Sequence, residues 1–281
     1  MTKTENYYLP AVMLVFLCLT VFLFCSKTNN TVGDDNNIGP VMGDSLIANH
    51  YATSDFDLIP SNYRILIADS LKIFYGHTSH GSQIMTGLDM IEAENSNYAQ
   101  PTIHEISDDL GHNGDTSWVP LTRTWLNANT DYNVVVWSWC GGCSDNTTAG
   151  INAYLAALNR LEADYPNVIF IYMTGHLDGT GESGDLHLHN EQIRKYCRDN
   201  NKWLFDFADI ESWDPDGNYY LDENADDACN YDGGNWAVEW QNSHSDGEDW
   251  YSCGSAHSEP LNANMKAFAV WWLFSQIAAQ I

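Results

Sequence analysis

A serine stands between two histidines at one predicted corner of the chain, in GHTSHGS at residues 76–82. The apolar run LKIFYG at 71–76 predicts a buried strand, and apolar residues at helical spacing follow the corner. At such a strand-to-helix turn Ser79 faces helix N–H groups, which is typical of a nucleophile. A serine hydroxyl attacks a carbonyl well only when an adjacent imidazole accepts its proton. The alternative interpretation is that Ser79 only caps the helix.

Other candidate side chains also follow predicted strands. They are His77, His80, Trp139, His176 and His257, the last in the segment that enters the final helix. Because ligands bind at the carboxyl ends of the strands in open α/β sheets, we expect these residues to lie close together. We interpret His77, His80, Trp139 and His176 as substrate contacts, and His257 as the general base toward Ser79.

Predicted strands and helices alternate from about residue 45 onward. The predicted strands are residues 71–76, 101–107, 133–139, 167–175 and 203–209. The predicted helices are residues 81–95, 149–165, 188–200 and 261–281. This alternation indicates an α/β protein whose mainly parallel sheet is covered by helices on both faces. We therefore expect one three-layer α/β/α domain over residues 45–281 with about five strands.

Short motifs in this order resemble those of the SGNH or GDSL-like hydrolases. FYGHTSHGS is similar to the first block of that family, and CGSAHSEPLNANMKAFAVWWL is similar to the last block. DYNVVVWSWCGG resembles the strand that carries the third block. The resemblance implies a flavodoxin-like fold and a serine esterase, with Ser79 as nucleophile and His257 as general base.

Two parts of that family's site have to be found elsewhere in this chain. Gly254 stands where the family has an aspartate, so a backbone carbonyl or Asp249 would orient His257. The oxyanion needs preorganised donors worth about 3 to 4 kcal/mol each. Candidate donors are the nucleophile's own backbone N–H, Gly114 and Gly141.

The N-terminal segment predicts export. Residues 1–25 contain the apolar run AVMLVFLCLTVFLFC, which is short for a membrane span and typical of a signal sequence. Cys25 ends this run, and a polar tether follows at residues 26–44. The layout resembles a bacterial lipoprotein signal with Cys25 lipidated. Ordinary cleavage nearby and a retained anchor are the alternatives, and all three predict an exported or cell-envelope protein.

Export makes the remaining cysteines disulfide candidates. Five of them lie beyond Cys25, and we predict that Cys229 pairs with Cys253. The CGGC sequence at 140–143 has thioredoxin-like spacing, but it follows a strand in the middle of the chain. We interpret it as a local disulfide or a shaped loop.

The chain is strongly acidic, with 38 Asp and Glu against 11 Lys and Arg and a formal net charge of −27. Such a charge repels nucleic acid and anionic lipid, so we expect no nucleic-acid partner, and membrane contact only through an anchor at Cys25. Residues 211–250 predict a long acidic loop insertion, in which DPDGNYYLDE resembles a calcium loop. We predict structural Ca²⁺ on Asp214, Asp216, Asn218 and Asp222, and no cofactor for catalysis.

The sequence therefore predicts an exported serine esterase. Eleven tryptophans suggest a sugar-lined cleft, so an ester on a carbohydrate is the predicted substrate. One alternative is a metal-dependent hydrolase that uses the cluster His176, Asp178, His187 and His189. The other alternative is a non-catalytic glycan-binding module on the same fold.

Overall fold

The computed structural model describes residues 46–281. Three predicted features lie outside these residues: the signal segment, the lipidation site at Cys25 and the polar tether. What we expect of them therefore stays a prediction. Within residues 46–281, no helix combines the length and the apolar character needed to cross a bilayer.

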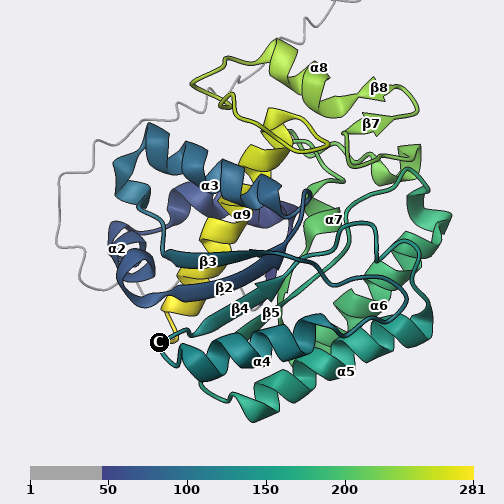
Figure 1. Cartoon of the computed structure of the whole chain (residues 1–281). Coiled ribbons are helices and arrows are strands. Elements are labelled where there is room, and N and C mark those ends of the chain that lie inside the picture. Colours follow the sequence, from purple (N-terminus) through teal and green to yellow (C-terminus); the bar gives the residue numbers. More distant parts are fainter. Residues whose placement is uncertain (1–45) are drawn as a thin grey trace, which may run out of the picture. The chain divides into compact units, whose positions relative to one another are not determined.

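A six-stranded parallel sheet forms the centre of the molecule (Figure 1). Its strands are β1 (Ile47–Ala48), β2 (Lys72–His77), β3 (Thr102–Ser107), β4 (Val134–Trp137), β5 (Ile169–Met173) and β6 (Trp203–Phe205). The strand order is β1-β6-β5-β4-β2-β3, and every neighbouring pair is parallel. The predicted fold class is thus confirmed, with six strands instead of about five. The additional strand, β1, has only two residues, which is too short for a hydrophobic pattern.

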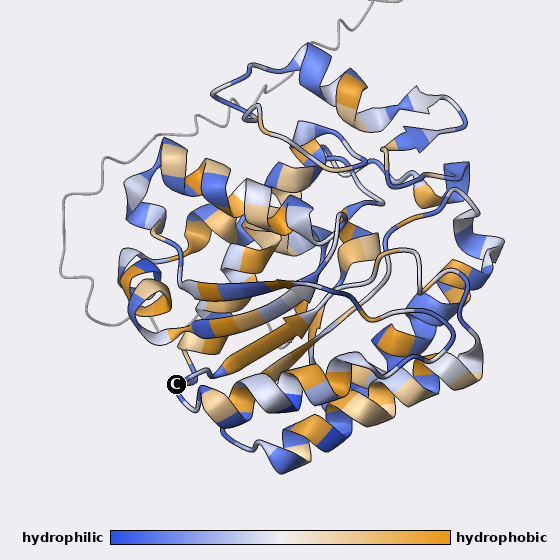
Figure 2. Cartoon of the chain, viewed as in Figure 1, coloured by the Kyte–Doolittle hydropathy of each residue, from blue (hydrophilic) through white to orange (hydrophobic). Residues whose placement is uncertain are grey.

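Helices cover both faces of the sheet. The helices are α1 (His50–Ser54), α2 (Ser61–Ser70), α3 (Ser82–Glu94), α4 (Trp118–Ala128), α5 (Thr148–Asp164), α6 (Asp185–Asn200), α7 (Phe207–Ile210), α8 (Trp236–Ser243) and α9 (Pro260–Ala278). In Figure 1, α3 and α9 lie on one face, and α4, α5 and α6 lie on the other. Figure 2 shows the inner strand β4 as hydrophobic, whereas the edge strand β3 is partly hydrophilic.

Alternate side chains of the central strands enter two apolar cores. Ile73 and Tyr75 of β2 pack with residues of α3 and α9, whereas Phe74 between them packs with residues of α4, α5 and α6. Val135 and Val136 of β4 are divided between the cores in the same way. This two-residue period follows from the pleat of a strand, and it explains why both faces of the strands read as apolar.

Several predicted boundaries differ from the structure, and two of the differences concern segments with candidate site residues or their neighbours. The strand expected at 203–209 ends at Phe205, because the Asp206 side chain accepts a hydrogen bond from Asp209 N and begins α7. The helix expected at 188–200 begins at Asp185, so the LHLH sequence is helical.

The acidic segment at 211–250 carries short elements of its own. These are a 3-10 turn at Leu221–Glu223, a hairpin of β7 (Asn230–Tyr231) and β8 (Gly234–Asn235), and α8. The segment that we predict as an acidic loop insertion thus contains these short elements between its loops.

The predicted disulfide between Cys229 and Cys253 is absent, because both residues are free cysteines. Cys229 Sγ lies 3.3 Å from Ser258 Oγ, and Cys253 Sγ accepts a hydrogen bond from Asn264. Cys140 and Cys143 are also free, so CGGC forms a shaped loop rather than a local disulfide.

A buried ion pair joins the sheet edge to the last helix. Lys266 Nζ of α9 lies 2.5 Å from Glu211 Oε1, and both side chains have 0% exposure. Lys266 also donates to Gln83 of α3, whose amide nitrogen donates to the Ala256 carbonyl. The second oxygen of Glu211 accepts a 2.8 Å hydrogen bond from Leu177 N. This network fixes the loops after β5 and before α9 relative to α3.

We expect Glu211→Ala to lower the free energy of unfolding by about 3 to 5 kcal/mol, because it leaves the Lys266 charge buried and unpaired. The control Lys195→Ala removes the exposed pair with Asp199 and should cost about 0.5 kcal/mol or less. Urea unfolding of both variants measures the difference. Equal, small losses would show that the buried pair does not brace the fold.

Candidate active site

Loops at the carboxyl edge of the sheet bring six polar residues together. Ser79 and His80 follow β2, Cys140 follows β4, and His176 follows β5. Asp227 comes from the acidic segment, and His257 precedes α9. This is the edge at which parallel α/β sheets bind ligands.

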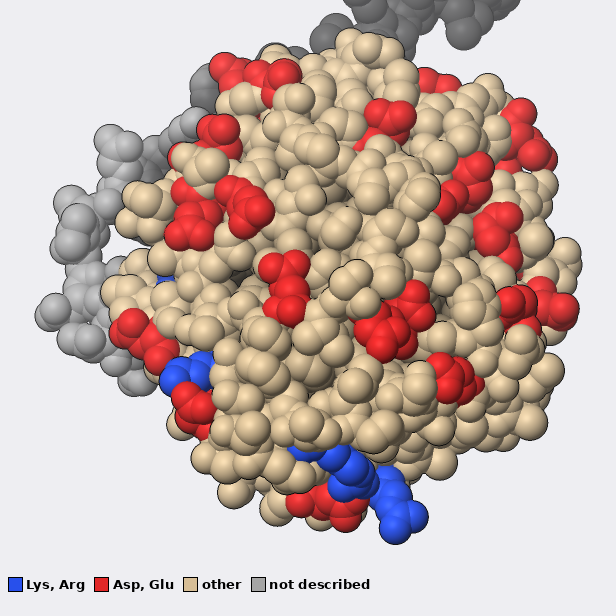
Figure 3. Space-filling model, in the orientation of Figure 1, with Lys and Arg blue, Asp and Glu red and all other residues tan. Residues whose placement is uncertain are grey.

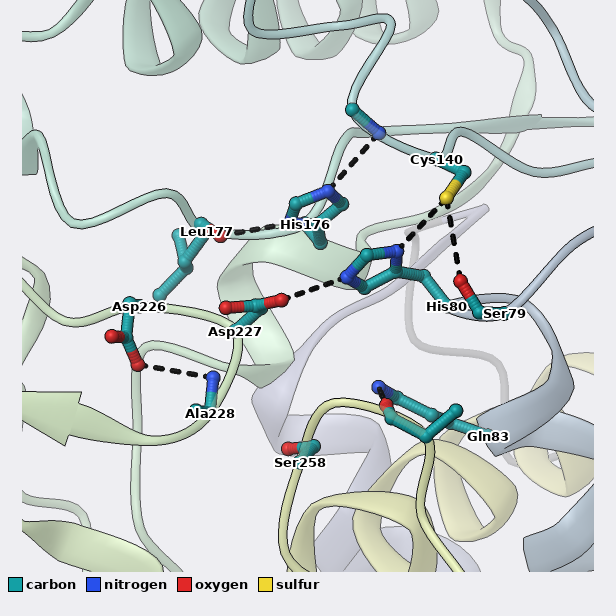
Figure 4. A network of polar contacts seen from close by, with 12 residues as sticks. Ser79, His80, Gln83, Cys140, His176, Leu177, Asp226, Asp227, Ala228 and Ser258 are labelled. Carbon is teal, nitrogen blue, oxygen red and sulfur yellow. Dashed lines mark hydrogen bonds and ion pairs between the residues drawn. The ribbon is translucent and has the colours of Figure 1, made fainter.

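The imidazole of His80 is the centre of this group (Figure 4). His80 Nε2 lies 2.8 Å from Asp227 Oδ2, and His80 Nδ1 lies 3.3 Å from Cys140 Sγ. The His80 residue is only 6% exposed. A carboxylate, an imidazole and a thiol are therefore aligned in the order that orients a general base toward a nucleophile.

Asp227 reaches this position because its loop is attached to the loop after β5. Asp178 and Asp226 form an isolated antiparallel bridge, and Gly179 N donates to the Ala225 carbonyl. The Asp226 side chain accepts hydrogen bonds from the backbone N–H of Ala228, at 3.0 Å, and of Asn230. These contacts turn the chain so that the Asp227 carboxylate faces His80 (Figure 4).

Electrostatics favour a neutral imidazole beside an ionised carboxylate. Burial lowers the pKa of His80, and the hydrogen bond to Asp227 offsets this only in part. Burial alone would raise the pKa of Asp227, but the hydrogen bond from His80 and the nearby His176 and His257 outweigh it, so this pKa is lowered. Neutral His80 then donates Nε2–H to Asp227 and presents an unprotonated Nδ1 to Cys140.

Two further histidines pack around His80. The His176 ring stacks on His80 with a centroid separation of 3.6 Å and an interplanar angle of 4°. His176 Nδ1 lies 2.8 Å from the Leu177 carbonyl, and Nε2 accepts a hydrogen bond from Gly141 N. The His257 ring stacks at 4.8 Å, from a residue with φ of 62°. His80 is therefore held by ring contacts as well as by hydrogen bonds.

The loop that carries Cys140 depends on two glycines. Gly141 has φ of +77°, which favours glycine. A Cβ on Gly142 would lie 1.7 Å from the Gly111 carbonyl oxygen, so a side chain there would displace the neighbouring loop. The CGG sequence therefore holds the Cys140 sulfur next to His80.

The structure brings Ser79 and His257 to the same edge, but no hydrogen bond joins them in the described part of the chain. Ser79 Oγ lies 3.4 Å from Cys140 Sγ, and the exposed His257 contacts the ring of His80. Asp249, the acid proposed for His257, accepts a hydrogen bond from Ser245 N. The Ser79–His257 pair stays a prediction, and the imidazole nearest to the nucleophilic groups is that of His80.

The other predicted site residues have separate surroundings. His77 Nε2 lies 2.8 Å from Glu105 Oε2. Trp139 is 3% exposed and donates to the Met173 carbonyl, which makes it a core residue and not a substrate contact. Gly114 packs against Gly150 at the start of α5.

One group of residues within 46–281 has the spacing of a metal site. Ligand atoms of His80, His176 and Asp227 lie within 4.8 Å of one another. The two imidazoles are parallel and face to face, however, and every ring nitrogen has a hydrogen-bonding contact. A shared ion would require at least one of the rings to turn, so the geometry favours a hydrogen-bonded relay.

The metal cluster proposed from sequence is not assembled. Asp178 accepts a hydrogen bond from Ser144, and His189 Nδ1 lies 2.9 Å from the Cys143 carbonyl. His176 belongs to the group around His80 instead. His187 and His189 lie on α6, and two helical residues that are two positions apart do not share a face.

The predicted calcium loop is closed by its own hydrogen bonds. Asp214 accepts from Asp216 N, Asn218 N and Nδ2, and the Tyr220 hydroxyl, all within 3.0 Å. These donors occupy both oxygens of the carboxylate. Calcium binding at Asp214, Asp216, Asn218 and Asp222 stays a prediction.

Comparisons with known proteins give only remote likenesses. The chain matches no protein-family model and no curated protein. A structure named as a candidate acylhydrolase from Bacteroides fragilis is 13% identical, covers 64% of this chain and 92% of its own, and has a TM-score of 0.34. A candidate GDSL-like lipase from Parabacteroides merdae is 10% identical, with 75% and 98% coverage and a TM-score of 0.42. A GDSL-like lipase from Bacteroides thetaiotaomicron is 14% identical, with 68% and 93% coverage and a TM-score of 0.35.

We expect an NMR titration of His80 to give a midpoint below 6.5, because burial lowers its pKa. Asp227→Asn removes a carboxylate that raises this pKa, so the midpoint should fall further. Asp232→Asn is the matched control, since it makes the same charge change at an exposed position of the same acidic segment and should leave the titration unchanged. A midpoint that rises in Asp227→Asn would contradict the assigned contact.

Proposed function

We propose that this protein is a hydrolase that cleaves an ester by nucleophilic catalysis at the carboxyl edge of the sheet. The contact that carries the proposal is the line Asp227–His80–Cys140, in which an imidazole lies between a carboxylate and a nucleophilic side chain. Ser79 lies beside the same sulfur, so the attacking group comes from the Ser79–Cys140 pair. The fold and the short motifs of the chain are consistent with this class of reaction.

Each residue of the relay has a distinct task. Asp227 fixes the tautomer and the orientation of His80 and stabilises the imidazolium that forms during the reaction. His80 accepts the proton of the nucleophile and later donates it to the leaving alcohol. The backbone N–H of Ser79 has no acceptor among residues 46–281, and it is a candidate donor to the oxyanion.

The charges around the site favour a substrate without negative charge. The loops at 78–81, 138–146, 174–184, 211–235 and 244–259 contain no Lys or Arg. On the face drawn in Figure 3, Asp and Glu are spread widely, while the few visible Lys and Arg lie at the lower border and at the left side. An anionic ester would meet repulsion here without a compensating cation.

The tryptophans bear on the identity of the substrate. All eleven tryptophans lie in residues 46–281, and each is buried or half-buried. Ten of them belong to the apolar cores or pack against them, and Trp213 stacks on His50, so the support that they gave to a carbohydrate ester is reduced. An uncharged ester, including an acyl group on a neutral sugar, fits the site. Export and lipidation at Cys25 remain part of the proposal.

We expect His80→Ala to lower kcat/KM for p-nitrophenyl acetate by about 10³-fold or more, because it removes the general base. Asp227→Asn should cost a similar factor by releasing the imidazole. His257→Ala is the discriminating control, and its activity should fall by about tenfold or less if the ring only packs on His80.

Two outcomes would contradict this assignment. If His257→Ala is inactive and His80→Ala retains turnover, His257 is the base. If EDTA abolishes activity and added Zn²⁺ restores it, the group of His80, His176 and Asp227 is a metal centre instead.

A further inference from the structure

Two side chains meet at the sulfur of Cys140 (Figure 4). Ser79 Oγ lies 3.4 Å from this sulfur, and His80 Nδ1 lies 3.3 Å from it. Cys140 is half-buried, so its residue keeps contact with solvent at the edge where substrate would bind. The base therefore contacts the thiol directly, whereas the only side-chain contact of the Ser79 hydroxyl in the described part of the chain is the same sulfur.

The other cysteines of residues 46–281 have different surroundings. Cys143, Cys197 and Cys229 are at most 1% exposed, and burial raises the pKa of Cys143 and of Cys229 to about 12. Cys253 is half-buried but contacts an amide, and burial raises its pKa too. Within this part of the chain, Cys140 alone has its sulfur within hydrogen-bonding distance of an imidazole nitrogen.

The hydrogen bonds around His80 assign its two nitrogens. Nε2 donates to the Asp227 carboxylate, so the unprotonated Nδ1 faces the S–H group of Cys140. Proton transfer from sulfur to Nδ1 needs no movement of either residue. After that transfer, the imidazolium N–H and the Ser79 hydroxyl are both placed to donate to a thiolate.

We propose, resting on the hydrolase function, that Cys140 rather than Ser79 is the nucleophile and that Ser79 donates a hydrogen bond to its thiolate. The thiolate forms a C–S bond with the ester carbonyl carbon, and the C–O bond to the alcohol breaks as His80 protonates the leaving oxygen. Water then attacks the thioester, and His80 accepts its proton. The C–S bond breaks, the carboxylic acid leaves, and the His80 proton returns to sulfur.

Three variants of the full chain distinguish the two candidate nucleophiles in p-nitrophenyl acetate hydrolysis. Cys140→Ala should lower kcat/KM by about 10³-fold or more. Ser79→Ala should lower it by about tenfold, the worth of one hydrogen bond. Cys253→Ala, which removes the other half-buried thiol, should stay within about twofold of wild type.

The opposite ranking overturns the inference. If Ser79→Ala is inactive and Cys140→Ala stays within about tenfold of wild type, Ser79 is the nucleophile, and the hydrolase function stands as long as His80→Ala is inactive. If wild type turns over no ester at all, the hydrolase function itself fails.

A second measurement needs neither a substrate nor a Cys140 variant. Wild-type protein is treated with iodoacetamide at pH 7, and peptide mass spectrometry follows the alkylation of each cysteine. Cys140 should react at least about tenfold faster than Cys253, and His80→Ala should remove this advantage because the base is gone. If Cys140 reacts no faster than Cys253, or equally fast without His80, the thiol is not activated and the inference is wrong.

Discussion

The buried pair of Lys266 and Glu211 is the constraint on which the site depends. Two opposite charges with no exposure must stay together, since separating them leaves an uncompensated charge in the core. Through Gln83 and the backbone of Leu177, this pair connects α9 to the helix that follows His80 and to the loop that carries His176. Burial lowers the pKa of Lys266, and Glu211 offsets part of that cost. The ion pair and its hydrogen bonds therefore fix the positions of these loops relative to one another. The conformational preferences of the loop residues alone would not do so.

The imidazole of His80 contacts side chains from three of these loops, those of Cys140, His176 and Asp227. His80 is buried enough to stay neutral, yet its two nitrogens contact a carboxylate and a thiol. The stacked ring of His176 limits rotation of His80, and Gly141 N fixes His176 in turn. An orientation set by packing on the ring faces and by hydrogen bonds in the ring plane is the preorganisation that general-base catalysis requires.

The fold was largely predictable because its inner strands β2, β4, β5 and β6 are buried on both faces. The apolar stretch VVVW of β4 and the helix after Ser79 carry strong local patterns, and the structure confirms both. The edge at which the candidate residues gather was also predictable, because the carboxyl ends of parallel strands lie at the same edge of the sheet. The partner of His80 was not predictable, because Asp227 comes from an acidic segment in which nothing in the spacing singles it out. Cys140 had a detectable signal, a cysteine and two glycines directly after a strand, but the CGGC spacing directed attention to a disulfide.

The central claim is that Asp227, His80 and Cys140 form one catalytic relay. A crystal structure of the protein after reaction with a slowly hydrolysed aryl ester tests it most directly, because the position of the trapped acyl carbon identifies the nucleophile. We predict the acyl group on Cys140 Sγ, with the 2.8 Å contact between His80 and Asp227 retained. An acyl group on Ser79 Oγ, or a metal ion coordinated by His80 and Asp227, would contradict the account.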